Sequence, residues 1–176
     1  ISYGVALAKE FEAKLFVSHV IDLSSVAIYG EFQLDPVGQQ NRIMEDADAQ
    51  LKKLAGGQAI SWEPLITVGK PADEISRAVE EKDIDLVITA TRGRSGLKRI
   101  ILGSVTERLM RTLSCPLLVV NSPEHKFISV ADQAVKIEKI LVGCDFSPDS
   151  GQAFNHALSL AQEFQAELHL AHVIEP

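Results

Sequence analysis

Two stretches of this sequence, 153 residues apart, are copies of each other. Residues 1–22 align without a gap on residues 154–175, and nine of the 22 aligned pairs are identical. A repeat period of this length is about the size of one domain. We therefore expect a tandem repeat with both ends truncated, in which residues 1–122 form one domain, residues 123–136 a linker, and residues 137–176 the start of a second domain.

Helical and strand hydrophobic periods alternate along the chain. Strands are predicted at 15–21, 60–68, 85–91, 117–121, 137–144 and 168–174, and helices at 1–12, 38–54, 71–82, 104–113 and 148–164. Such alternation is typical of βαβ units, whose strands run parallel and whose crossovers are right-handed. The predicted fold class is α/β, with an open, doubly wound, mainly parallel sheet. In such sheets ligands bind in the loops that follow the strands.

The net charge limits the classes of partner that the chain is expected to bind. It has 17 lysines and arginines against 24 aspartates and glutamates, a formal net charge of −7 and a pI near 5.2. An acidic chain repels phosphate at long range, so we expect neither general nucleic-acid binding nor binding to anionic membranes. No apolar run reaches the roughly 18–20 residues of a membrane span, and the amino end lacks the basic region of a signal peptide. These features predict a cytoplasmic protein.

One segment departs from this acidic background. Residues 92–111 hold six basic side chains and one acid, Glu107, which gives a charge of +5 against −12 for the remaining chain. The segment follows a predicted strand, contains three glycines, and leads into a helix whose first residues fit a capping box with Ser104 as N-cap. Glycines, a helix N-terminus, hydroxyls and guanidinium groups together are typical of a phosphate site. The alternative is a capped helix beside solvated arginines.

Familiar enzyme and metal signatures are missing from the sequence. It contains neither a Walker P-loop nor a dinucleotide-binding glycine motif, and no zinc-protease, serine-hydrolase or EF-hand signature. Its two cysteines, Cys115 and Cys144, lack metal-ligand spacing and are interpreted as small buried hydrophobic residues. His19 and His172, equivalent in the repeat, are interpreted as core histidines. No catalytic or metal-binding residue is therefore predicted.

Several segments together resemble the universal stress protein family. They are Asp85–Ala90, Thr91–Leu102, Gly103–Glu107, Ser114–Val120, His19–Asp22 and Val142–Ser147. ATP-binding members of this family carry the motif G-x2-G-x9-G-[ST], and this chain has Ala90-x2-Gly93-x9-Gly103-Ser104. Alanine, in place of the first glycine, is small and leaves close approach possible in an ordinary backbone conformation. The resemblance implies a Rossmann-like half of the adenine nucleotide alpha-hydrolase-like type.

The resemblance also implies where a nucleotide, ATP with Mg²⁺, binds. It places the phosphates on the backbone around the glycine motif, adenine at the backbone of Val20, and the ribose side at an Asp-x-Ser motif, here Asp145 and Ser147. The nucleotide-binding residues implied in this way are Val20, Ala90, Arg92, Gly93, Gly103, Ser104, Val105, Thr106, Asp145 and Ser147. Asp145–Ser147 also fits a helix start with Ser147 as N-cap and Pro148 at the first helical position. Both interpretations can hold.

The resulting prediction is a universal stress protein that binds ATP or another adenine nucleotide and acts as a regulatory or sensor module in stress response. Two alternatives stay open. One is a stress protein that acts only through protein contacts, which Ala90 favours; the other is a slow ATPase or nucleotidyl or phosphoryl transferase, for which residues 92–106 offer no general base. The predicted partners are the nucleotide, an unidentified protein, and a second subunit or repeat paired through the strand 117–121, as a homodimer or an intramolecular pseudo-dimer.

The family topology also places a strand between 15–21 and 85–91 that residues 1–122 do not contain. The second repeat holds a copy of it at 137–144. A vacancy at the centre of a sheet leaves two rows of backbone groups unpaired, at a cost of about 1–3 kcal/mol for each buried group. We therefore hypothesise that residues 137–144 enter the sheet of the first repeat, either within one chain or by exchange between chains. The alternative is that the protein continues before Ile1 and that the preceding segment supplies this strand.

Overall fold

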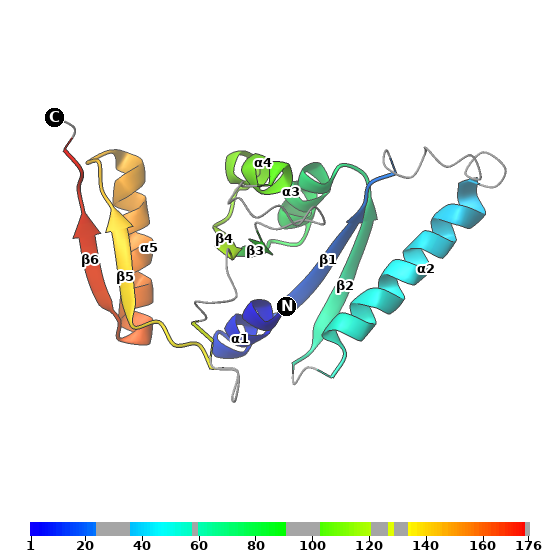
Figure 1. Ribbon diagram of the computed structural model, residues 1–176, viewed down its shortest axis with the longest axis horizontal. Helices are drawn as coiled ribbons and strands as arrows, with labels where there is room; N and C mark the ends of the chain where they lie inside the picture. The colour runs from blue at the N-terminus through cyan, green and yellow to red at the C-terminus, as the bar shows by residue number, and fades with distance from the viewer. Residues whose placement is uncertain (24–35, 58–59, 91–102, 121–126, 129–133, 175–176) are drawn as a thin grey trace. The chain divides into compact units, whose positions relative to one another are not determined.

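A computed structural model describes residues 1–23, 36–57, 60–90, 103–120, 127–128 and 134–174 of the chain. Helices and parallel strands alternate along these residues (Figure 1), which confirms the predicted α/β class. The chain divides into two compact units, Ile1–Glu124 and His125–Pro176.

The first unit contains two pairs of parallel strands. Its described elements, in chain order, are α1 (Ser2–Glu10), β1 (Leu15–Ile21), α2 (Pro36–Ala55), β2 (Trp62–Val68), α3 (Pro71–Glu81), β3 (Val87–Ala90), α4 (Ser104–Thr112) and β4 (Leu117–Val120). β1 pairs with β2, from Leu15↔Trp62 to Ile21↔Val68, and β3 pairs with β4, from Val87↔Leu117 to Ala90↔Val120. Within the described residues these pairs remain two separate sheets.

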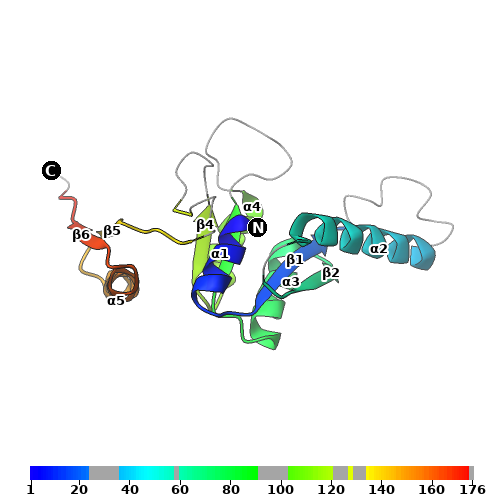
Figure 2. The same cartoon turned by 90° about the horizontal axis from the view of Figure 1, so that it is seen from below.

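Small and aliphatic side chains form the core of the first unit. α2 packs along β1 and β2 (Figures 1 and 2), whereas α3 packs on β1 and α4. The buried hydrophobic residues of these helices and of α1 are Val5, Ala6, Leu7, Ala8, Ala47, Leu51, Ala55, Ala72, Ala78, Val79 and Leu109. Alanine is common among them because it favours the helix and loses no side-chain entropy on burial.

The ends of α2 and α3 follow the predicted signals. α3 begins at Pro71 and has Asp73 and Glu74 in its first turn, where carboxylates complement the helix dipole. α2 ends immediately before Gly56, whose amide donates a hydrogen bond to the carbonyl of Lys52 at 2.7 Å. A Cβ at Gly56 would lie 2.3 Å from that oxygen. The close approach therefore requires glycine at this position.

The second unit is a strand–helix–strand motif. β5 (Lys139–Gly143) pairs in parallel with β6 (Glu167–Ala171), and α5 (Pro148–Phe164), seen end-on in Figure 2, connects and contacts both strands. Its buried hydrophobic side chains include Val142, Ala157 and Ala161. The residue after α5, Gln165, adopts the left-handed conformation and ends the helix.

β5 does not fill the place between β1 and β3 within this chain. Among the described strands its sheet contains β6 alone, and both strands belong to the second compact unit. The hypothesis of insertion within one chain is therefore wrong. α5 provides the physical reason, because it follows β5 after four residues and its second half is the sequence copy of α1. Both helices would need the same place on the sheet.

The cysteines and two of the histidines are more exposed than predicted. Cys115 and Cys144 are free thiols and only half-buried, and desolvation raises the pKa of Cys115. His19 in β1 and His172 just after β6 are exposed, so their interpretation as core histidines is wrong. Each histidine lies on a two-stranded sheet. The residues of such a sheet have fewer neighbouring strands to bury them than those of the wider sheet expected from the sequence.

Candidate functional site

The start of α4 differs from the predicted capping box. Gly103, with φ −62° and ψ 148°, occupies the N-cap position, and no side chain caps the helix. Ser104 is instead the first helical residue. Glu107 does not reach back to the helix start, because its carboxylate accepts a hydrogen bond from Arg111 at 2.9 Å, an i,i+4 pair on the helix surface. The prediction of Ser104 as N-cap is therefore wrong, whereas the helix begins where it was expected.

This geometry leaves backbone donors in the first turn of α4. The amides of Ser104, Val105 and Thr106 precede the first intrahelical hydrogen bond, which the amide of Glu107 donates to the carbonyl of Gly103 at 2.9 Å. Ser104 is exposed, but Thr106 retains only 2% of its surface. A bound anion would therefore meet the hydroxyl of Ser104 and the backbone of the turn, rather than the hydroxyl of Thr106.

Two of the basic side chains around α4 have carboxylate partners. Nη2 of Arg108 lies 2.6 Å from Oδ1 of Asp73 on α3, and Arg111 pairs with Glu107. Each pair is largely exposed, and such pairs contribute about 0–1 kcal/mol to stability. They partly offset the predicted positive charge. The other predicted members of this basic segment, together with Arg92 and Gly93, lie outside the described residues.

Val20 and Ala90 lie at the carboxyl ends of β1 and β3. The carbonyl of Ile21 accepts a hydrogen bond from the amide of Gly69 at 3.0 Å, on the β2 side of β1. Because alternate residues of a parallel strand direct their backbone groups to opposite neighbours, the N–H and C=O of Val20 point away from β2. Ala90 is the last residue of β3 and has an extended backbone, paired with Val120.

Asp145 and Ser147 form the start of α5 in the second unit. The amide of Ser147 donates to Oδ1 of Asp145 at 2.9 Å, and Oγ of Ser147 accepts a hydrogen bond from the amide of Ser150 at 3.1 Å. Hydrogen bonds, from the side chain of Ser147 first and then from its backbone, lower the pKa of Asp145 to about 2. The predicted helix start, with Ser147 as N-cap and Pro148 first in the helix, is confirmed.

The structure also joins residues that the sequence reasoning did not connect. Nδ1 of His172 lies 2.7 Å from the carbonyl oxygen of Cys144, and its ring centre is 4.5 Å from that of Phe146. Phe146 has φ of 64° and is 78% exposed. The sequence position of His172, directly after β6, could have predicted this contact. The carboxyl ends of adjacent parallel strands lie at the same edge of a sheet, so the residues after β5 and after β6 are neighbours.

The predicted residues therefore divide between the two units. Val20, Ala90 and Gly103–Thr106 belong to the first unit, and Asp145 and Ser147 to the second. Among the described residues, no group of three or more histidine, cysteine or acidic side chains is placed to hold a metal ion. No helix in the described part of the chain is long and apolar enough to cross a membrane.

The fold and these residues agree with a comparison against protein families. The model of the universal stress protein family matches residues 1–121 and 136–176. The chain belongs to the universal stress protein family. Universal stress protein MJ0531 of Methanocaldococcus jannaschii is 33% identical over 126 residues, which cover 70% of this chain and 74% of that protein. Universal stress protein YxiE of Bacillus subtilis is 31% identical over 130 residues, covering 66% of this chain and 85% of that protein.

Solved structures of the family share the fold. The hypothetical protein MJ0577, also from Methanocaldococcus jannaschii, aligns at 25% identity with a TM-score of 0.53, covering 69% of this chain and 88% of that chain. A universal stress protein from Archaeoglobus fulgidus aligns at 23% identity with a TM-score of 0.73. That alignment covers 99% of this chain and 62% of the archaeal chain.

Proposed function

We propose that this universal stress protein binds ATP, with Mg²⁺, and acts as a regulatory or sensor module in the response to stress. The observation that carries the proposal is the start of α4, where Gly103 precedes three first-turn amides that no side chain caps. Such amides, together with the positive end of the helix dipole, favour a bound phosphate. Arg92 and Gly93 complete the proposed phosphate-binding segment.

The strand ends of the first unit support the same ligand. The outward backbone groups of Val20 provide one donor and one acceptor for the edge of adenine. Ala90 stands where the family motif has glycine, but its extended backbone needs no positive φ, so alanine is tolerated there. The alternative of a stress protein without nucleotide loses its main support. An enzymatic role is not favoured either, because Glu107, the carboxylate in the described part of α4, is paired with Arg111.

We further propose that Asp145 and Ser147 belong to the corresponding site of a second repeat. The carboxylate of Asp145 is ionised at neutral pH, since its pKa is about 2, and it retains lone pairs for the hydroxyls of a ribose. The match of the family model to two segments of the chain supports this tandem arrangement.

We also propose that copies or repeats associate through β4. β4 pairs with β3 along one edge, and within the described residues its other edge has no strand beside it. An edge strand presents unpaired backbone donors and acceptors to another strand. The cytoplasm, where ATP and Mg²⁺ are available, is the proposed compartment.

Calorimetric titration with ATP and Mg²⁺ tests the proposed function. Gly103→Val places a branched side chain where a phosphate must approach the backbone, and we expect it to weaken binding about tenfold or more. The matched control is Gly151→Val in α5, because a Cβ at Gly151 meets nothing within 4 Å. We expect the control to bind ATP as the unaltered chain does. No saturable heat at millimolar ATP, or equal losses in the two variants, contradicts the proposal.

A further inference from the structure

A side chain joins the carboxyl ends of β5 and β6. The amide of Cys144 donates to the carbonyl of Ala171 at 2.8 Å, and Nδ1 of His172 lies 2.7 Å from the carbonyl oxygen of Cys144. A carbonyl oxygen only accepts hydrogen bonds, so Nδ1 carries a proton and donates it. Both backbone groups of Cys144 are therefore bonded to residues at the end of β6.

The hydrogen bond from His172 takes the place of the next one in the strand ladder. The amide of Glu167 donates to the carbonyl of Glu138 at 2.9 Å, and such bonds recur at every second residue of a parallel pair. Continued in the same register, the ladder would run from the amide of Val173 to the carbonyl of Cys144. In the described part of the second unit that carbonyl accepts from His172 instead. The amide of Val173 stays outside the ladder, and on the same alternation it points toward β5.

The ring of Phe146 packs against the imidazole of His172. The two ring centres lie 4.5 Å apart, and the ring planes are inclined by 48°. Phe146 has φ of 64°, a left-handed conformation that is unfavourable for a bulky residue and persists where surrounding contacts hold it. Residues in such conformations are concentrated at functional sites. The loop after β5 is therefore held by His172 at two points, Cys144 and Phe146.

The residue between these two points is Asp145, which was placed above on the ribose side of a nucleotide site. The amide of Val173 lies at the same edge of the sheet, because the carboxyl ends of β5 and β6 are adjacent. Val173 is the repeat counterpart of Val20, whose backbone is proposed to bind adenine. One imidazole thus orders both groups that would contact a nucleoside.

We propose, on the basis of the function proposed above, that His172 is a positioning residue for the nucleotide site of the second repeat. Its hydrogen bond to Cys144 keeps the amide of Val173 out of the strand ladder and available to the edge of adenine. Its contacts with Cys144 and Phe146 hold Asp145 beside that amide, toward the ribose.

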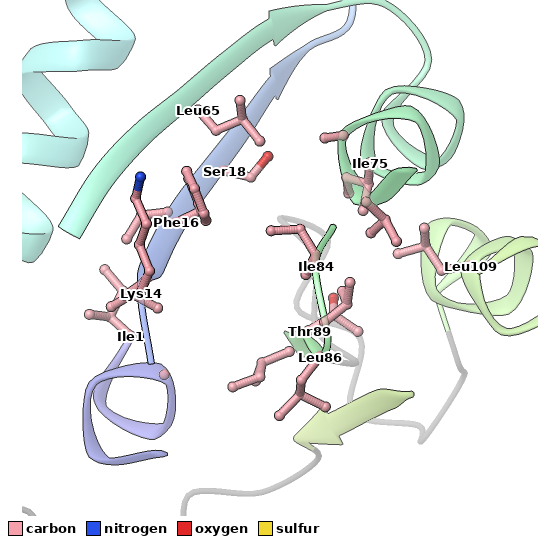
Figure 3. Close-up of a pocket in the computed structure, with 17 residues that line it drawn as sticks. Ile1, Lys14, Phe16, Ser18, Leu65, Ile75, Ile84, Leu86, Thr89 and Leu109 are labelled. Carbon is pink, nitrogen blue, oxygen red and sulfur yellow. The ribbon is translucent and has the colours of Figure 1, made fainter. Parts of the chain in front are cut away.

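The first unit carries the same tripeptide, His19-Val20-Ile21, at the end of β1. A cavity of about 390 Å³ lies between β1 and β3 (Figure 3). The family topology places the counterpart of β5 there, so the corresponding partner of His19 would be the residue after that strand. The second unit contains both strands of the pair, and the role of the histidine is therefore tested there.

Hydrogen exchange of the Val173 amide, followed by NMR in the ¹⁵N-labelled full chain, tests this role. His172→Phe keeps a ring beside Phe146 but removes the donor, so the carbonyl of Cys144 becomes free to accept from Val173. We expect exchange at Val173 to slow about tenfold, whereas a merely structural loss would speed it. The matched control is His169→Phe, the same change at an exposed position of β6, which should leave exchange at Val173 unaffected.

His172→Asn is the rescue variant. Its side-chain amide can donate from near the position of Nδ1, so exchange at Val173 should match that of the unaltered chain. In the unaltered chain, the ring ¹⁵N shifts of neutral His172 should show the proton on Nδ1. Unchanged or faster exchange in His172→Phe, or a neutral ring protonated at Nε2, overturns the role of His172. The ring measurement does not depend on the folding of any variant.

Titration with adenosine tests the ligand separately. We expect a saturable shift of the Val173 amide in the unaltered chain, and about tenfold weaker binding in His172→Phe, which loses the free amide. No shift at Val173 up to millimolar adenosine contradicts the proposed nucleotide site of the second repeat, and with it the use of this amide, whatever the exchange rates show. Equal binding by the unaltered chain and His172→Phe overturns the positioning role alone.

Discussion

Arg108 on α4 and Asp73 on α3 form an ion pair, with Nη2 of the arginine 2.6 Å from Oδ1 of the aspartate. A second contact, 3.0 Å between the hydroxyls of Ser76 and Thr112, joins the same two helices. α3 therefore helps to fix the direction of α4, whose first turn carries the proposed phosphate site. The ion pair also holds a guanidinium group that would otherwise be available to an anion.

Asp73→Asn is expected to strengthen ATP binding about two- to fivefold at low salt, because it releases Arg108 while keeping the shape of the side chain. Calorimetry at low and high salt checks this, and the gain should shrink as salt rises. The control is Glu81→Gln on the same helix, which makes the same charge change but pairs with Arg77 and not with α4. An equal gain in the control would show a general charge effect instead.

Leu109→Ala is expected to destabilise the first unit by about 2–5 kcal/mol, because Leu109 is completely buried and its removal leaves a cavity beneath α4. Its neighbour Met110 is 60% exposed, so Met110→Ala should change the free energy of unfolding by about 0.5 kcal/mol or less. Urea unfolding of both variants provides the measurement. Similar values for the two would show that α4 is not packed as described.

Ser147→Ala is expected to destabilise the second unit by about 1 kcal/mol, because it removes the side-chain acceptor that caps α5. Ser159→Ala is the control. Its hydroxyl bonds to the carbonyl of Asn155 within the same helix, and its loss should cost almost nothing, since alanine favours the helix. Thermal unfolding followed by circular dichroism distinguishes them, and a harmless Ser147→Ala would refute the capping role.

Low pH is expected to destabilise the second unit, because it protonates the carboxylate of Asp145. Its folded-state pKa is lowered from 3.8 to about 2, chiefly by hydrogen bonding from Ser147. The ionised carboxylate therefore stabilises the fold above its ordinary pKa, and this contribution is lost as the pH falls from about 4 to about 2. Urea unfolding at several pH values from about 6 to about 2 provides the measurement. The free energy of unfolding should fall less with acid in Asp145→Asn than in the unaltered chain. An unchanged pH profile in that variant would contradict the assignment.

The α/β class was predictable because strand and helix periods differ, and the positions of Pro71 and Ser147 mark helix starts by local chemistry alone. The N-cap of α4 could not be predicted in the same way. Gly103 and Ser104 are both acceptable N-cap residues, and local preference does not choose between them. The exposure of His19 and His172 depends on how many strands flank β1 and β6. The contact of His172 with Phe146 joins segments far apart in sequence, which no local period encodes.

The most direct test of nucleotide binding follows the backbone amides of Ser104, Val105 and Thr106 by NMR in a ¹⁵N-labelled chain titrated with ATP and Mg²⁺. We expect saturable shifts at these three amides and at Val20, whereas the amides in the middle of α5, around the buried Ala157, serve as an internal reference. If ATP leaves the amides of residues 104–106 unmoved while other surfaces respond, the first turn of α4 does not hold the phosphates, and the central claim is wrong.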